Sequence, residues 1–164
     1  MNGEPSGPLE PTASRVLPSG KVFAVCGLWL VALGAYFVFL RPPMLPDDLR
    51  YIGSSLDAMR AAAPGFERWL EHVFDVMGGF MVAAGAMTVL AAWRLRARSE
   101  RVSLAALSLA GAAGVALMSA TNFALGSDFR WLLLLPALLW VVGLACHVYE
   151  GAASRTTENR TAST

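Results

Sequence analysis

The chain has 164 residues, of which 55% are hydrophobic and 15% are charged, and its mean hydropathy is +0.51. This composition is too apolar for an ordinary soluble domain of the same length, so it favours one small membrane domain. A net charge of +1 argues against nucleic acid as a partner, because phosphate recognition needs a clustered basic surface. Two cysteines, Cys26 and Cys146, are too few for a disulfide framework.

Residues 1–20 are rich in proline, glycine and serine, which predicts a disordered tail. The apolar run at about 22–40 predicts the first membrane helix, and Pro42 and Pro43 end it. A secretory signal peptide is the alternative, because cations precede the run. We favour an uncleaved helix, since the run is longer than the ~7 to 15 residues of a signal core.

Between the first two apolar runs, residues 47–62 carry apolar side chains at helical spacing, which predicts a short amphipathic helix. These side chains are Leu49, Ile52, Leu56 and Met59. Pro46, Asp47 and Asp48 are typical of a helix start. The helix either lies on the membrane surface, or over the end of the bundle, or gates a ligand cavity.

The second membrane helix is predicted at about 66–95, and its apolar part is long enough to cross the ~30 Å hydrocarbon layer. One acid, Asp75, lies just inside this apolar part. Small or short residues follow it at steps of three and four: Gly78, Gly79, Val82, Ala83 and Ala86. Because a carboxylate is costly against lipid and small residues permit close packing, we expect this stripe to face protein.

The third and fourth membrane helices are predicted at about 102–125 and 130–149, with a tight turn between them and a kink at Pro136. Residues 151–164 are polar and predict a second disordered tail. The sequence therefore predicts an all-α membrane protein, an antiparallel four-helix transmembrane bundle at 21–150 with one short extracytoplasmic amphipathic helix.

Orientation is predicted from the cations near the helix ends. Those on the side of both termini are Arg15, Lys21, Arg94, Arg96, Arg98, Arg101, Arg155 and Arg160. Those on the other side are Arg41, Arg50, Arg60, Arg68 and Arg130. By the positive-inside rule, both termini of this multi-pass chain are expected to be cytoplasmic in the cell membrane.

Under this topology, polar residues gather at the outer end of the bundle. The candidate site consists of His72, Asp75, Ser119, Asn122, Asp128 and Arg130. One interpretation is an interhelical network that fixes packing, for example Asp75 with Asn122 or an arginine. The other is a site for a polar ligand, an ion or a proton, with Asp75 as the acid.

A second group, at the inner end, contains Cys26, Cys146 and His147, whose predicted depths permit contact. Two cysteines and one histidine are an incomplete set for zinc, so we interpret them as packing residues. No motif for haem, nucleotide, hydrolase or metalloprotease chemistry is found. We therefore expect no cofactor, no metal and no catalytic residues.

Three segments together resemble small uncharacterised bacterial membrane proteins with four transmembrane helices. The segments are residues 41–53, Met77 to Gly79, and Ser127 to Trp131. The resemblance covers most of residues 21–150. It implies a four-span protein of the bacterial inner membrane and carries no activity with it.

These observations favour a non-enzymatic integral membrane protein that binds a small or lipid-like ligand or acts as a partner subunit. The expected partners are the lipid bilayer and either a second copy or another membrane protein. The alternative is a small oligomeric carrier or an ion or proton pathway that uses Asp75. An enzyme is the third candidate class, because one acid and one histidine are too few catalytic groups to indicate a reaction.

Overall fold

The computed structural model describes residues 18–95 and 101–161, and every regular element within them is a helix. Of the tail expected at 1–20, residues 1–17 lie outside the described residues, and Pro18 to Gly20 begin a helix. The elements are α1 (Pro18–Phe39), α2 (Pro46–Ile52), α3 (Leu56–Ala62), α4 (Phe66–Arg94), α5 (Arg101–Gly111), η1 (Ala112–Ala116), α6 (Leu117–Ala124) and α7 (Arg130–Thr161).

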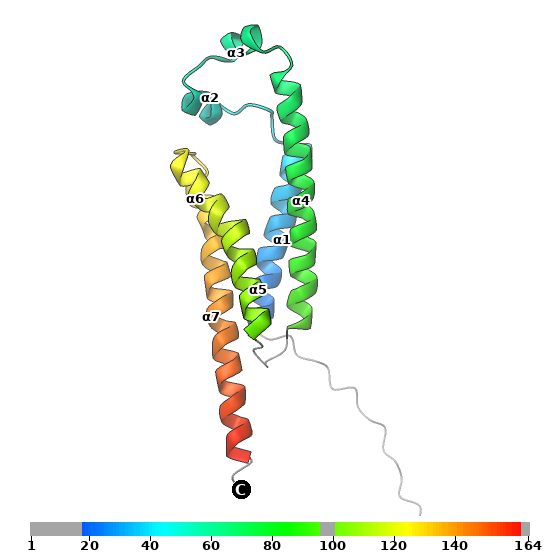
Figure 1. Cartoon of the computed structure of the whole chain (residues 1–164), viewed down its shortest axis with the longest axis vertical. Helices are drawn as coiled ribbons and strands as arrows, with labels where there is room; N and C mark the ends of the chain where they lie inside the picture. The colour runs from blue at the N-terminus through cyan, green and yellow to red at the C-terminus, as the bar shows by residue number, and fades with distance from the viewer. Residues whose placement is uncertain (1–17, 96–100, 162–164) are drawn as a thin grey trace, which may run out of the picture.

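Four helical segments are long and apolar enough to cross a membrane, as the sequence predicted. The apolar 18-residue stretch within each has a mean hydropathy of 2.3 in Pro18–Phe39, 1.8 in Phe66–Arg94, 1.7 in Leu104–Ala124 and 2.1 in Arg130–Thr156. The third segment is one continuous rod of α5, η1 and α6, in which η1 is a π-helical turn. The all-helical class and the packing of four spans are therefore confirmed (Figure 1).

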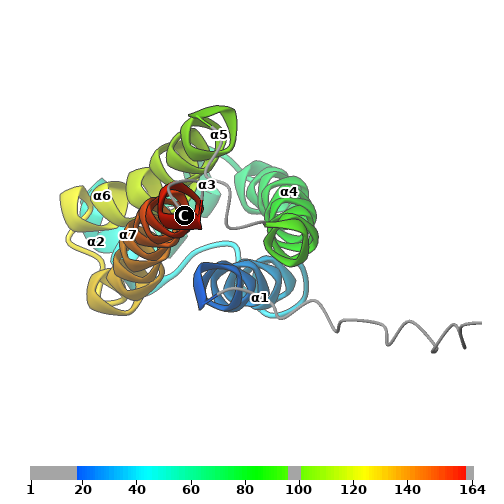
Figure 2. The same cartoon turned by 90° about the horizontal axis from the view of Figure 1, so that it is seen from below.

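The spans form two antiparallel hairpins, α1 with α4 and the α5–η1–α6 rod with α7 (Figure 1). The hairpins join where α1 lies against α7, as the view along the bundle in Figure 2 shows. By contrast, among the elements that the structure describes, α4 packs extensively against α1 alone. α1 is therefore the helix that holds the bundle together.

Contact between α1 and α4 depends on two pairs of glycines that face each other, Gly27 with Gly85 and Gly34 with Gly78. A Cβ added at any of the four would lie 2.5 to 2.7 Å from the carbonyl oxygen of its partner glycine. Real Cβ atoms do not come so close to an oxygen. The two backbones therefore touch directly, which is the arrangement that small residues permit between membrane helices.

Valines fill the space between the glycine pairs with the same spacing. Each glycine has a valine of the opposite helix beside it; the four valines are Val31, Val38, Val82 and Val89. Within each helix the glycines are seven residues apart, which keeps them on one face over two turns. The contact therefore extends along most of both helices.

Aromatic packing joins α1 to α7. The rings of Phe23 and Trp140 meet edge to face with centroids 5.3 Å apart, and a Cβ on Gly143 would lie 3.0 Å from the Phe23 ring. The Trp140 Nε1–H donates to the carbonyl oxygen of Leu107 on α5 at 3.0 Å. One buried indole therefore links α1, α7 and the α5–η1–α6 rod.

The stretch 47–62, expected to be one amphipathic helix, instead forms two short helices, α2 and α3. Gly53 ends α2 with a left-handed backbone (φ 72°), and its N–H donates to the Leu49 carbonyl. Ser55 then begins α3, because its side chain accepts the Ala58 N–H at 3.2 Å. The apolar periodicity runs through this break, which is why the break was missed.

The last helix is also longer than predicted. α7 continues to Thr161, past residue 149, where the sequence analysis ended the helix and placed a disordered tail. Glu150, Ala152, Ala153 and Arg155 are strong helix formers, and a helix that already exists is extended without a new nucleation step. Figure 1 shows this segment projecting beyond the other helices.

The glycine contact predicts opposite outcomes at two adjacent positions of α4. Gly78→Ala should destabilise the protein by about 1–3 kcal/mol, because its Cβ meets the Gly34 carbonyl oxygen at 2.7 Å. Gly79→Ala should be neutral or stabilising, because nothing lies within 4 Å of its Cβ and alanine favours helix. Thermal unfolding in detergent measures both; equal losses would contradict a direct backbone contact at Gly78.

Candidate functional site

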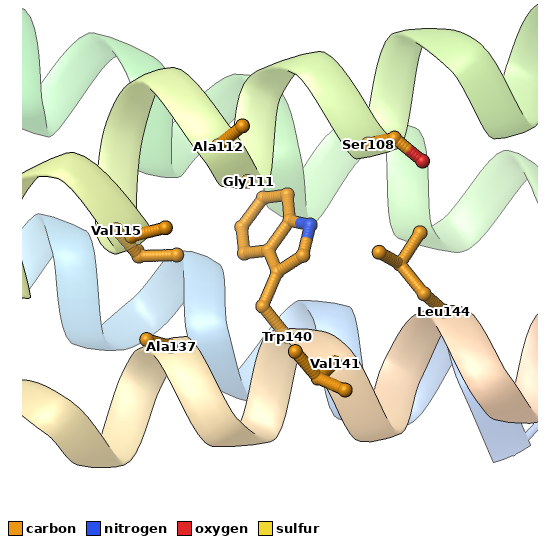
Figure 3. A pocket seen from close by; sticks show the side chains of 9 residues that line it. Ser108, Gly111, Ala112, Val115, Ala137, Trp140, Val141 and Leu144 are labelled. Atoms are coloured by element: carbon orange, nitrogen blue, oxygen red, sulfur yellow. The ribbon is translucent and has the colours of Figure 1, made fainter.

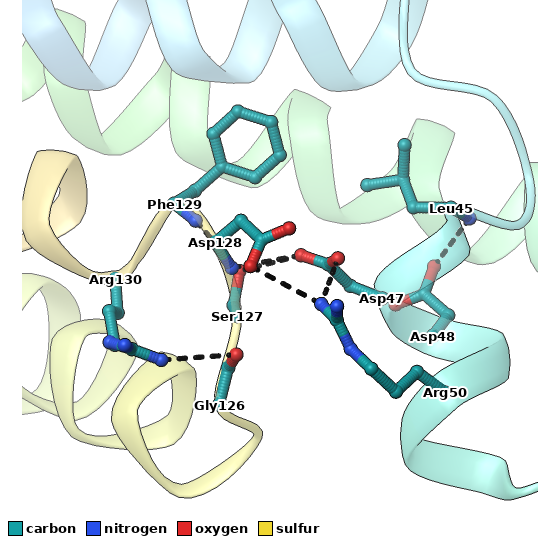
Figure 4. A network of polar contacts seen from close by, with 9 residues as sticks. All are labelled: Leu45, Asp47, Asp48, Arg50, Gly126, Ser127, Asp128, Phe129 and Arg130. Atoms are coloured by element: carbon teal, nitrogen blue, oxygen red, sulfur yellow. Dashed lines mark hydrogen bonds and ion pairs between the residues drawn. The ribbon is translucent and has the colours of Figure 1, made fainter.

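A polar network joins α2 to the turn between α6 and α7; we call Asp47, Arg50, Ser127 and Asp128 the α2 network (Figure 4). The Asp47 carboxylate accepts the backbone N–H of Asp128 at 2.9 Å and the Ser127 hydroxyl at 3.5 Å. Arg50 donates to both Asp47 and Asp128, the second at 3.3 Å. These contacts connect the segment after α1 to the start of α7.

The charge of Asp47 belongs to this network. The backbone N–H of Asp128 lowers the pKa of the Asp47 carboxyl, and the Arg50 guanidinium lowers it further. Because the folded pKa lies below the unfolded value of about 3.9, the stabilisation is complete above that value. It is lost as the pH falls through the lowered folded pKa, so the network is intact at neutral pH.

Arg41 anchors the other end of the segment that leads into α2. Its guanidinium lies 3.6 Å from the centroid of the Phe74 ring on α4 and 5.3 Å from that of Phe37. It also pairs with Asp48 at 3.1 Å, and its side chain is only 9% exposed. Cation–π contacts with the two rings and an ion pair with the carboxylate stabilise this guanidinium. Arg41 therefore positions α2 against α4.

The structure does not bring the six residues of the predicted outer site together. Asp128 belongs to the α2 network, whereas Arg130 donates to the Gly126 carbonyl oxygen within its own turn at 3.2 Å. Ser119 is buried at 4% exposure, and the Asn122 amide donates back to the Met118 carbonyl oxygen at 2.9 Å. Their shared depth in the membrane was a poor guide, because depth does not say which flank of a helix a side chain occupies.

His72 and Asp75 form a separate pair on α4. The His72 Nδ1 lies 3.7 Å from the Asp75 Oδ2, and their side chains are 73% and 52% exposed. The expected contact of Asp75 with Asn122 or an arginine is not found among the described residues. The expected inward-facing stripe is confirmed at Gly78 and Val82, which contact α1, but not at Gly79, which faces open space, or at the exposed Asp75.

A shallow apolar groove lies between the α5–η1 segment and α7, and it was not predicted from the sequence. Its volume is about 220 Å³. We call it the α5–α7 groove; its lining residues are Ser108, Gly111, Ala112, Val115, Ala116, Ala137, Trp140, Val141 and Leu144 (Figure 3). The alanine and glycine content of the third helix, which favours close packing, was the only available signal for it.

Trp140 forms the wall of this groove. Its indole lies against the backbone at Gly111, where a Cβ would collide with the ring (Figure 3). The hydrogen bond to Leu107 and the edge contact with Phe23 hold the ring in one orientation. The π-helical turn of η1 begins at Ala112, directly beside it, and such turns occur frequently at functional sites.

The two cysteines do not meet. The Cys26 Sγ lies 4.0 Å from the Pro136 carbonyl oxygen, whereas Cys146 is ten residues further along α7, about 15 Å at 1.5 Å per residue. Both are free thiols. Among the described residues no group of three or more histidine, cysteine or acidic side chains could hold a metal ion.

Comparisons with protein-family models, curated proteins and solved structures found no match. The class of the protein therefore follows from its four spans: the chain is a multi-pass integral membrane protein with four packed helices. The four-span architecture implied by the resemblance of residues 41–53 is present, and no family is identified.

The α2 network predicts that Asp47→Ala frees the segment between α1 and α4. Losing the acceptor of the Asp128 N–H and the partner of Arg50 should speed tryptic cleavage after Arg50 and Arg60 in proteoliposomes several-fold. Asp57→Ala is the control, because Asp57 lies exposed on α3 outside the network. Cleavage unchanged by Asp47→Ala at neutral pH would show that the network does not hold α2.

Proposed function

We propose that the chain is a non-enzymatic integral membrane protein that holds a lipid-like ligand, an acyl chain, in the α5–α7 groove. The supporting observation is the groove itself, whose walls are apolar apart from Ser108. Ala112, Ala116 and Val141 on its rim are exposed, so the groove opens to the surroundings of the bundle. In a bilayer those surroundings are acyl chains.

The rigidity of the groove also supports ligand binding. Trp140 is fixed by its bond to Leu107 and by Phe23, and only 3% of it is exposed. A preformed surface needs little ordering when a ligand binds, so less interaction energy is lost. An acyl chain bound here would be more ordered than one in the bulk bilayer.

A partner-subunit role is the second candidate, and the flank of α4 favours it. Gly79 has open space where a side chain would be, and Ala83 and Ala86 beside it are exposed. Small residues on a membrane helix permit another helix to approach. The carrier alternative is less well supported, because Asp75 is half exposed and paired with His72 and does not line the groove.

We further propose that both termini are cytoplasmic and that α2 and α3 lie on the other side, because the cations concentrate near the end of α4 and the start of α5. With Cys26 and Cys146 replaced by alanine, Ser54→Cys should react with an impermeant maleimide in intact cells. Ser154→Cys should react only after permeabilisation. The reverse pattern would invert the topology and leave the four spans unchanged.

Trp140 itself can report on the groove. In a variant with phenylalanine at Trp29, Trp69, Trp93 and Trp131, a brominated fatty acid should quench Trp140 fluorescence saturably in detergent, because the indole lines the groove. Ala112→Leu, which fills the groove, should weaken that binding roughly tenfold, the equivalent of about 1.4 kcal/mol.

The matched control is Ala83→Leu, the same substitution on the exposed flank of α4. It should leave the quenching curve unchanged. Quenching that does not saturate, or that Ala112→Leu and Ala83→Leu alter equally, would contradict a specific acyl-chain site.

A further inference from the structure

At the end of the bundle opposite α2 and α3, one carboxylate ties the start of α1 to α7. Glu150 accepts the backbone N–H of Ser19 at 2.9 Å through Oε1 and the Ser19 hydroxyl at 2.5 Å through Oε2. Ser19 is completely buried. A carboxylate is favourable here, because the first turn of a helix presents free N–H groups and the positive end of its dipole.

His147 lies one turn before Glu150 on the same face of α7. Gly143, four residues earlier, contacts Phe23 of α1, and Glu150, three residues later, contacts Ser19. Since residues at these steps share a helix face, His147 faces the first turn of α1 between Ser19 and Phe23. Its imidazole is 1% exposed, and neither Nδ1 nor Nε2 has a hydrogen-bond partner among the described residues.

A buried imidazole without partners needs an explanation, because it leaves both a donor and an acceptor unsatisfied. A structural role alone would be served better by leucine or phenylalanine. Histidine differs from both in that it gains a charge between about pH 5 and 8. Its place beside the first turn of α1 puts it near the end of a membrane span.

Of the charged groups near His147, one can accept a hydrogen bond from its protonated ring. Apart from Glu150, the charged side chains described at this end of α1, α4 and α7 are cations, namely Lys21, Arg94, Arg155 and Arg160. Cys146 and Tyr149 project from other faces of α7. Glu150, at i+3, is the carboxylate within reach of an imidazolium on this face.

We propose that His147 is a proton-operated switch of the junction between α1 and α7. When the ring binds a proton, the imidazolium N–H takes the Glu150 carboxylate from the N–H and hydroxyl of Ser19. The first turn of α1 then loses its negative partner and separates from α7. Loss of the proton returns the carboxylate to Ser19, and no covalent bond changes in either direction.

Hydrogen–deuterium exchange of the full chain in detergent tests the switch, with exchange corrected for its intrinsic pH dependence. Protection of the peptide that contains Ser19 should fall several-fold between about pH 8 and pH 5.5. The peptide that contains Gly78 and Gly85 is the internal control, and its protection should not change, because the glycine contact with α1 contains no titratable group.

The chain has two histidines, so each serves as the control for the other. His147→Leu should remove the pH response and keep α1 protected, and His147→Gln provides a second, polar variant that cannot titrate. His72→Gln, at the exposed position, should keep the response. A wild-type chain without a response, a response that survives both His147 variants, or one lost in His72→Gln would overturn the proposal.

Discussion

The direct backbone contact between α1 and α4 is the constraint on which the rest of the bundle depends. Within a bilayer, lipid is as apolar as leucine, so helices gain little from burying apolar side chains and associate through close packing. Gly27, Gly34, Gly78 and Gly85 supply that packing over two turns. One face of α1 packs against α4. The adjacent face, which carries Phe23 and Cys26, packs against α7.

The second hairpin is joined by a different device, a single large side chain among small ones. Trp140 fits against Gly111 and reaches Leu107, while Gly143 leaves room for Phe23. A bulky ring holds the α5–η1–α6 rod away from α7 next to the point where the π-helical turn begins. The α5–α7 groove is thus a consequence of how the hairpin packs, and it exists before any ligand arrives.

The spans could be predicted because length and hydropathy are local properties of the sequence, but the contact faces could not. Gly78 and Gly79 are adjacent and identical, and only the matching spacing of Gly27 and Gly34 on another helix decides which of them faces protein. The residues of the predicted outer site were grouped by depth, and depth does not say which flank of a helix a side chain occupies. The paired seven-residue glycine spacing was the signal available in the sequence.

The two ends of the bundle differ in how their polar groups are satisfied. At the α2 end, the Asp47 carboxylate accepts hydrogen bonds from Asp128 and Arg50. The Asp48 carboxylate accepts from Arg41 and from the Leu45 N–H. Because the Asp128 N–H and the Arg50 guanidinium lower the pKa of the Asp47 carboxyl, this group is charged at neutral pH. At the opposite end the Glu150 carboxylate accepts from Ser19, and the buried imidazole of His147 beside it has no hydrogen-bond partner among the described residues. We propose that a response of this bundle to protons begins where α1 and α7 meet, because the buried His147 lies there on the same helix face as the carboxylate that holds Ser19.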